Sequence, residues 1–190
     1  MEPGLLLSGY AAGYFPMASS QSGEIRWYSP DPRAIIPLDE FKISRSLRQT
    51  LKKNQFAIRL DTVFEEVMRL CAAREDTWRS EEIVQSYLEL HRCGYAHSGE
   101  AWKNDRLAGG LYGVALGAAF FGESMFSRVR DASKVSLVHL VERLRSKGFD
   151  LLDTQFLTPH LNRFGAREIS RGDYLIQLKK AIRKRRVFTD

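Results

Sequence analysis

The sequence predicts an α+β fold, in which helices pack on a mostly antiparallel sheet. Three strand-like segments follow one another at residues 95–102, 107–116 and 118–123, with only a polar turn and Gly117 between them, which predicts an antiparallel meander. Segments with helical spacing of apolar residues lie before and after this meander. The chain has 190 residues, of which 44% are hydrophobic, enough to form a buried core and too many for a disordered chain.

The first 33 residues differ in composition from the rest. They are rich in Gly, Pro, Ser and aromatic residues, and two prolines flank Asp31, which favours extended or turn backbone there. We therefore predict a small N-terminal domain over residues 1–33 and a main domain over residues 34–190. In the main domain, helices are expected at about 41–53, from 61 or 62 to 73, and from Ser80 to a stop at Gly94.

After the meander the pattern returns to helix. Residues 133–147 carry apolar residues on one helical face, and residues 149–153 form a short apolar strand. A helical turn at 159–164 and a final helix from Ser170 to about residue 184 complete the expected order.

Positive charge is concentrated in two segments. The net charge is +6, and residues 41–60 contain six basic residues and no acid, while residues 179–190 contain six basic residues and one acid. In the first segment, helical spacing aligns Lys42, Arg45, Arg48 and Lys52 on one face. A solvated helix face is the simpler interpretation, but the lack of acids favours a polyanion partner. The basic C-terminal segment has the pattern of a solvated end, and its use is not predicted.

Several kinds of chemistry are excluded. The four histidines and two cysteines, Cys71 and Cys93, show no metal-ligand spacing, and no Walker, GxSxG or GxGxxG motif occurs. Gly109, Gly110 and Gly113 indicate close backbone approach or a bulge. Two cysteines in apparent helices favour a reducing compartment, and no segment resembles a signal peptide or a membrane span. We expect a cytoplasmic protein without a membrane partner.

Three polar residues lie inside apolar strand segments. Glu123 lies in GAAFFGESMFS, and Asp153 and Gln155 lie in FDLLDTQFL, two residues apart and so expected to face the same way. Because a buried carboxylate is costly unless paired, each could simply accept backbone hydrogen bonds at a strand end. The functional interpretation is a pocket, beside Met125, Phe126 and Ser127, that binds a cationic group and handles an amine proton.

Taken together, the motifs resemble those of the leucyl/phenylalanyl-tRNA–protein transferases over nearly the whole chain and in the same order. The matching segments are GYFPM (13–17), WYSPDPR (27–33), ISRSLR (43–48), AHSGEAW (96–102), GGLYGVALG (109–117), GESMFS (122–127) with ASK (132–134), and LLDTQFLTPHL (151–161). The resemblance implies an N-acetyltransferase-like catalytic domain behind a small N-terminal domain, with no metal or other cofactor.

The resemblance also implies an activity. Such an enzyme moves Leu or Phe, and less well Met, from an aminoacyl-tRNA to the N-terminal Arg or Lys of an acceptor protein, which marks that protein for N-degron-dependent degradation. Asp153 and Gln155 match the family's reaction centre, where Gln155 either helps to remove the amine proton or only positions substrates while the tRNA 2′-hydroxyl carries the proton. A neutral amide is a poor base, so we favour positioning, with Asp153 and Glu123 holding the cationic acceptor terminus.

The resemblance further assigns substrate-binding positions. The remaining positions that match the pocket for the transferred side chain or border it are Trp78, Tyr87, Leu111, Met125, Val138 and Ser127. Those that match the tRNA-facing helix are Arg45, Arg48, Lys52 and Lys53, which would contact phosphates with little sequence preference. We expect a monomer.

The chain departs from the family pattern at several places. It begins close to GYFPM, so we expect a shortened N-terminal domain, and Met17 replaces a frequent Trp. Gly99 and Leu111 replace an aliphatic residue and a frequent Met, which could alter the preference between Leu and Phe.

Two rival functions remain. A small-molecule N-acyltransferase would need a Gly-rich turn before the helix at 132, where the sequence reads SRVRD. A non-catalytic RNA-binding module would explain the basic helix and leave GESMFS and DTQ unexplained.

Overall fold

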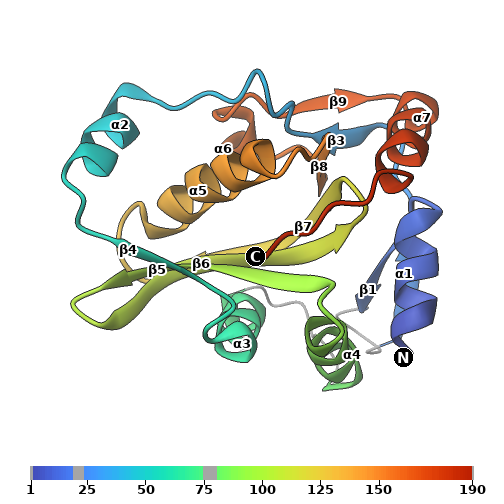
Figure 1. Cartoon of the computed structure of the whole chain (residues 1–190), viewed down its shortest axis with the longest axis horizontal. Helices are drawn as coiled ribbons and strands as arrows, with labels where there is room; N and C mark the ends of the chain where they lie inside the picture. Colours follow the sequence, from blue (N-terminus) through green and yellow to red (C-terminus); the bar gives the residue numbers. More distant parts are fainter. Residues whose placement is uncertain (1, 19–23, 75–80, 190) are drawn as a thin grey trace.

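The computed structural model describes residues 2–18, 24–74 and 81–189. A seven-stranded sheet has the order β4-β5-β6-β7-β8-β3-β9 (Figure 1). The strands β1 and β2 form a separate two-stranded sheet. Every neighbouring pair in the large sheet is antiparallel except β7 and β8. The expected α+β fold with a mostly antiparallel sheet is therefore confirmed.

The predicted meander is the centre of the sheet. It consists of β5 (Ala96–Lys103), β6 (Arg106–Leu116) and β7 (Ala119–Ser127), and the predicted strand near 149–153 is β8 (Leu151–Gln155). The strands that flank this centre were not predicted: β3 (Arg33–Ile35), β4 (Ala57–Leu60) and β9 (Arg167–Ile169). Each has only three or four residues, too few for a reliable period-two pattern.

The main helices lie where the sequence predicts them. They are α2 (Arg45–Lys52), α3 (Phe64–Arg74), α4 (Glu81–Arg92), α5 (Ala132–Ser146), α6 (Pro159–Asn162) and α7 (Arg171–Ile182). The basic helix α2 begins later than expected because Ser44 caps it, its Oγ accepting a hydrogen bond from the backbone N–H of Leu47 at 3.2 Å. Ser80, the expected start of α4, lies outside the described residues.

The sheet separates two cores. Helix α5 covers one face, and α3 and α4 cover the other (Figure 1). Tyr87, Tyr112 and Phe121 belong to the core beneath α3 and α4, whereas Leu111, Phe120 and Val138 belong to the core beneath α5. A site between the strands of this sheet is thus enclosed by helices on both sides.

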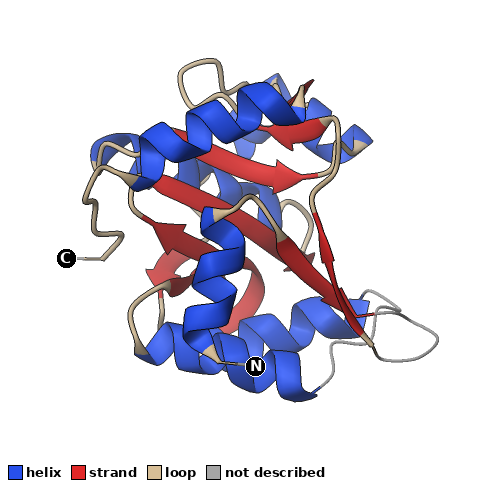
Figure 2. Cartoon of the chain, turned by 90° about the vertical axis from the view of Figure 1, so that its right-hand side faces the viewer, coloured by secondary structure: helices blue, strands red, loops and turns tan. Residues whose placement is uncertain are grey.

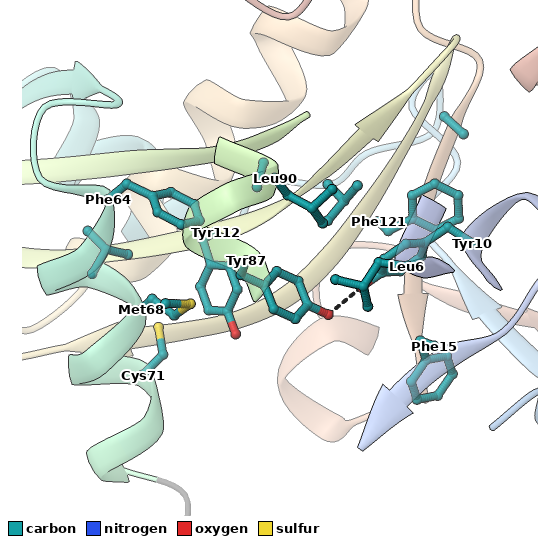
Figure 3. Packing of buried hydrophobic residues seen from close by; sticks show 14 of the residues in the cluster. Leu6, Tyr10, Phe15, Phe64, Met68, Cys71, Tyr87, Leu90, Tyr112 and Phe121 are labelled. Atoms are coloured by element: carbon teal, nitrogen blue, oxygen red, sulfur yellow. Dashed lines mark hydrogen bonds between the residues drawn. The ribbon is translucent and has the colours of Figure 1, made fainter. Parts of the chain in front are cut away.

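The N-terminal segment joins the first of these cores. Helix α1 (Pro3–Ala11) contacts α4, α7 and β6, and Figure 2 views the molecule with this helix in front of the strands. Leu6, Tyr10 and Phe15 are fully buried in the same cluster as Tyr87 and Phe121 (Figure 3). The strands β1 (Phe15–Ala18) and β2 (Ile25–Tyr28) follow. The domain boundary after residue 33 stays a prediction.

The basic C-terminal segment is anchored, contrary to the expectation of a solvated end. Phe188 is buried against Phe120 and Phe149, and its carbonyl accepts a 2.6 Å hydrogen bond from Nε of Arg143 on α5. Arg186 donates to the carbonyl of Gly148 at 3.0 Å. The buried aromatic ring of Phe188 provides the apolar contact that a string of basic residues lacks.

Candidate active site

A cavity of about 880 Å³ opens where β7 and β8 separate. Their parallel pairing runs from Ala119 opposite Leu151 to Phe121 opposite Asp153 and stops there. Beyond that point both strands contribute to the cavity wall, β7 with residues 122–125 and 127 and β8 with residues 154–155. The apolar part of the wall includes Ile83, Leu111, Met125, Leu137, Leu140, Leu152 and Leu161. Such a mixture of an apolar wall and a few polar groups is typical of a ligand site.

A β-bulge on each strand lies beside the cavity. In β7, Glu123 is the extra residue, because Tyr112 pairs with Ser124 and Gly113 pairs with Gly122. The predicted glycine requirement holds at this point, since a Cβ on Gly113 would collide with the carbonyl oxygen of Phe121. In β8, Thr154 is the extra residue between the pairs that Asp153 and Gln155 make with β3. Bulges turn side chains out of the regular alternation of a strand, and here they do so at the cavity.

Glu123 is surrounded by hydrogen-bond donors from three elements. Its Oε1 accepts from the hydroxyl of Tyr10 at 2.7 Å and from Nε2 of Gln155 at 3.0 Å, and its Oε2 accepts from the hydroxyl of Tyr87 at 3.1 Å. The two tyrosine hydroxyls also lie within hydrogen-bond distance of each other, as the dashed line in Figure 3 shows; since each has one proton, the hydroxyl that donates to its neighbour does not donate to Glu123 at the same time. Burial raises the pKa of Tyr10 well above its ordinary value, and the negative charge of Glu123 raises it further. Tyr10 therefore remains a protonated donor that orients the carboxylate.

Asp153 belongs to a second, fully buried cluster. Its carboxylate accepts from Arg33 at 2.9 and 2.6 Å and from the hydroxyl of Tyr174 at 2.7 Å. Arg33 also donates to the carbonyl of Gly13 at 3.1 Å and lies over the rings of Phe15 and Tyr174. Burial alone would lower the pKa of Arg33, but its hydrogen bonds to Asp153 and the charge of that residue outweigh burial and raise it. The pair is thus a charged, bidentate contact.

The two clusters meet at Gln155. Its backbone N–H donates to Asp153 at 2.8 Å, and its side-chain amide donates to Glu123 at 3.0 Å. The backbone of Gln155 has a positive φ of 66°, which an unconstrained glutamine rarely adopts. The hydrogen bond from its N–H to Asp153 holds this conformation, and the amide then lies in the cavity wall. Asp153 therefore does not line the cavity itself but holds Gln155, which does, in position.

This geometry corrects one prediction about the two acids. Glu123 and Gln155 line the cavity, but Asp153 does not, and its exposed fraction is 0%. The expectation that Asp153 and Gln155 face the same way is wrong because the bulge at Thr154 and the positive φ of Gln155 break the strand alternation. The four donors around Asp153, two of them on Arg33, leave no open side for a substrate group.

The predicted pocket residues divide into three groups. Tyr87, Leu111, Met125 and Ser127 line the cavity. Val138 does not, since it is 1% exposed and α5 presents Leu137 and Leu140, three residues apart, to the cavity instead. Trp78 lies outside the described residues.

The basic helix α2 lies beside the part of the cavity wall formed by Asp131, on the side of the molecule away from β1 (Figure 1). The hydroxyl of Thr50 on α2 donates to Asp131 at 3.3 Å, and Asp131 precedes α5 and lines the cavity. Lys134 pairs with the same carboxylate at 2.6 Å and also lines the cavity. The predicted tRNA-contacting side chains are all exposed and make no ion pair with a residue that the structure describes: Arg45, Arg48, Lys52 and Lys53.

Sequence reasoning missed three residues of the two clusters. Tyr10 is 113 residues from Glu123 along the chain, and Arg33 and Tyr174 are 120 and 21 residues from Asp153, so no local motif connects them. A partial signal existed for Arg33, because a cation directly before the apolar run AIIP needs a partner when that run is buried. For Tyr10, the four-residue spacing from Leu6 indicated a common helix face.

Within residues 2–18, 24–74 and 81–189, no group of three or more His, Cys, Asp or Glu side chains could hold a metal ion. Over the same part of the chain, no helix has the length and apolar character to cross a membrane.

Comparison with protein families gives two matches. Residues 35–179 match the model described as leucyl/phenylalanyl-tRNA protein transferase, and residues 1–31 match the model for the N-terminal domain of that family. A protein of Herpetosiphon aurantiacus with the name leucyl/phenylalanyl-tRNA–protein transferase is 56% identical over 183 residues, which are 96% of this chain and 95% of the relative. A protein of the same name from Gloeobacter violaceus is 53% identical over 182 residues, covering 96% and 94%.

Solved structures resemble the chain more remotely. L-PGS from Bacillus licheniformis aligns with a TM-score of 0.44 and 11% identity over 80% of this chain. The C-terminal domain of a putative lysylphosphatidylglycerol synthetase from Agrobacterium fabrum aligns with a TM-score of 0.43 and 16% identity over 82% of this chain. The matched regions are 53% and 52% of those two solved chains.

Proposed function

Because this chain belongs to the leucyl/phenylalanyl-tRNA–protein transferase family, we propose that it transfers Leu or Phe, and less well Met, from aminoacyl-tRNA to the N-terminus of an acceptor protein. In this reaction the α-amino nitrogen of the acceptor attacks the ester carbonyl carbon of the aminoacyl-tRNA. A peptide bond forms, and the bond between that carbon and the ribose oxygen breaks. The proton lost by the amine ends on the released ribose hydroxyl.

The observation that carries the proposal is the carboxylate of Glu123 in the wall of the cavity. Tyr10, Tyr87 and Gln155 donate hydrogen bonds that fix its position. An oriented carboxylate beside an apolar cavity favours the binding of an ammonium or amine group. We assign to Glu123 the binding of the acceptor's N-terminus, and to Gln155 the positioning of the reacting groups.

The catalytic contribution is positioning. Aminoacyl esters are already activated, and bringing two reactants into contact at a fixed geometry can supply a large part of a rate enhancement. A neutral amide such as Gln155 is a poor base, so its side chain orients the amine. Asp153 is a positioning residue in this scheme, since its contact with the Gln155 N–H holds the backbone that carries this amide.

The apolar part of the cavity suits the transferred side chain. A side chain of Leu or Phe can pack against the apolar wall formed by Leu111, Leu137, Leu140 and Leu152. The flexible side chain of Met125 can adapt to the shape of either one. Beside the part of the cavity wall formed by Asp131, α2 presents four exposed cations, which we assign to phosphates of the tRNA acceptor stem. The tRNA would thus enter from the side of α2 and Asp131, with its aminoacyl end in the cavity.

We further propose the finer properties expected of the family. The acceptor carries an N-terminal Arg or Lys, the product is an N-degron substrate, and the enzyme acts as a cytoplasmic monomer with a small N-terminal domain over residues 1–33. The contribution of Tyr10 from that segment to the Glu123 cluster supports a role of the N-terminal segment in the site.

The test is a transfer assay with defined substrates. Labelled Leu-tRNA or Phe-tRNA is incubated with peptides that differ only in a first residue of Arg, Lys or Ala. Label should appear in the Arg and Lys peptides and not in the Ala peptide. Failure of transfer from both charged tRNAs would exclude the enzymatic function and leave an RNA-binding module. Transfer to free small amines in place of peptides would favour a small-molecule N-acyltransferase.

A further inference from the structure

Three exposed apolar side chains form a rim beside the cavity. Met17 on β1, Tyr28 on β2 and Phe156 after β8 are 37%, 38% and 45% exposed. Met17 and Phe156 also line the cavity, so the rim is continuous with the site. Single exposed apolar residues are common on protein surfaces, but a contiguous group beside a binding site indicates a contact surface.

Ring contacts hold this rim together. The buried ring of Phe15 packs against Tyr28 with a centroid distance of 6.3 Å and against Phe156 with a centroid distance of 5.8 Å. In the β1–β2 ribbon Phe15 lies opposite Tyr28 and Met17 lies opposite Arg26, so all four side chains project from one face. That face is turned toward Phe156, which follows β8 and contacts Phe15.

We propose that this rim binds the acceptor polypeptide at the residues that follow its N-terminal residue, and that it favours aromatic or aliphatic side chains there. The inference rests on the proposed transferase function. With the acceptor's amine at Glu123 and Gln155, the remaining chain must leave the cavity. Phe156 directly follows Gln155, and successive residues of an extended chain are about 3.3–3.6 Å apart, so the second or third acceptor residue reaches the rim.

Charge distinguishes this occupant from the tRNA. Nucleic-acid contacts require cations to neutralise phosphates. Two described cations lie beside the residues of the rim, and both are paired: Arg26, opposite Met17, with Glu24 at 2.8 Å, and Arg33, over the ring of Phe15, with Asp153 at 2.6 Å. The exposed cations of α2 lie near the part of the cavity wall formed by Asp131. An apolar rim on the other side therefore fits an uncharged segment of polypeptide.

The experiment compares two acceptor peptides, Arg-Leu-Leu and Arg-Ser-Ser, each extended by the same soluble sequence. For the unaltered protein, the KM of the leucine peptide should be lower by about fivefold or more, as partial burial of one or two leucines implies. Phe156→Ser and Tyr28→Ser should each bring the two KM values closer together, with little change in the KM for Leu-tRNA. Val187→Ser is the matched control, because Val187 is 61% exposed on the anchored C-terminal segment.

The outcomes separate the two proposals. No transfer to either peptide would refute the transferase function itself. Transfer with equal KM values for both peptides in the unaltered protein would overturn only the rim proposal. A rim variant that raised the KM for Leu-tRNA, and left the ratio between the peptides unchanged, would assign the rim to RNA and also overturn it. Collapse of the ratio in Val187→Ser as well would mean that the effect does not come from the rim.

Discussion

The buried pair of Arg33 and Asp153 permits the most quantitative prediction. Both side chains are at most 1% exposed, and their closest N–O distance is 2.6 Å. In Asp153→Ala, the guanidinium of Arg33 stays buried without its counterion, and the Tyr174 hydroxyl and the Gln155 N–H lose an acceptor. Removing one partner of such a pair costs about 3–5 kcal/mol of unfolding free energy. For a chain of this size that corresponds to a fall in Tm of about 6–20 °C.

The assay is thermal and urea unfolding followed by circular dichroism, with a matched control. Asp150 also forms a 2.6 Å ion pair, with Lys184, but there both side chains are at least one-third exposed. Asp150→Ala should therefore change the unfolding free energy by less than about 1 kcal/mol. The double variant Arg33→Met/Asp153→Leu should be more stable than Asp153→Ala, because it leaves no buried charge unpaired.

Two results would refute this reasoning. One is equal stability of Asp153→Ala and Asp150→Ala, which would mean that the buried pair is not formed. The other is a loss of stability in the double variant that equals the sum of the losses in Arg33→Met and Asp153→Leu, since the effects of two residues that form a pair are strongly non-additive. Transfer activity of Asp153 variants is informative only at temperatures where the variant is folded.

Further predictions concern RNA binding, pH and side-chain preference. Arg45→Ala/Arg48→Ala should weaken aminoacyl-tRNA binding and lower the slope of log K against log salt by about 1.8, whereas Arg92→Ala on α4 should not, as filter binding at several salt concentrations would reveal. The pKa of Tyr10 is raised in the folded state by burial, so its stabilising contribution is present below the ordinary tyrosine pKa of about 10 and is lost as pH rises further. The urea midpoint of the unaltered protein should therefore fall as the pH rises above about 10, and it should fall less steeply in Tyr10→Phe. Equal slopes in the two proteins would contradict the burial of the Tyr10 hydroxyl. Leu140→Phe fills the cavity and should lower the ratio of Phe to Leu transfer by about tenfold. In contrast, Val138→Ile should leave this ratio unchanged. An equal change of the ratio in the two variants would contradict the finding that Leu140 lines the cavity and Val138 does not.

The parts of the fold that could be predicted depend on long, regular patterns. The meander, α5 and the basic face of α2 each repeat a period over eight or more residues, so the sequence alone was sufficient to predict them. The short strands β3 and β9 depend on pairing with β8 and with each other, which no local pattern encodes. The anchoring of Phe188 was missed for the same reason, because its partners lie about 39 or more residues away.

The candidate site was predicted in part. Glu123 and Gln155 stood out as polar residues in apolar strands, and the structure brings them into contact. The orientation of Asp153 could not be predicted, since it is fixed by Arg33, 120 residues away in sequence, and by a bulge that breaks the strand alternation. Tyr10 shows the same limit, as it reaches Glu123 across 113 residues.

The most direct test of the central claim is the transfer of Leu from Leu-tRNA to an Arg-initiated peptide by the unaltered protein and by Glu123→Gln. If Glu123 binds the acceptor's N-terminus, the unaltered protein adds one Leu to the peptide. The variant should then lose about 10²-fold in kcat/KM for the peptide, and its affinity for Leu-tRNA should not change. Equal rates for the two proteins, or a loss that appears only in tRNA affinity, would contradict the assignment of this cavity as the transferase site.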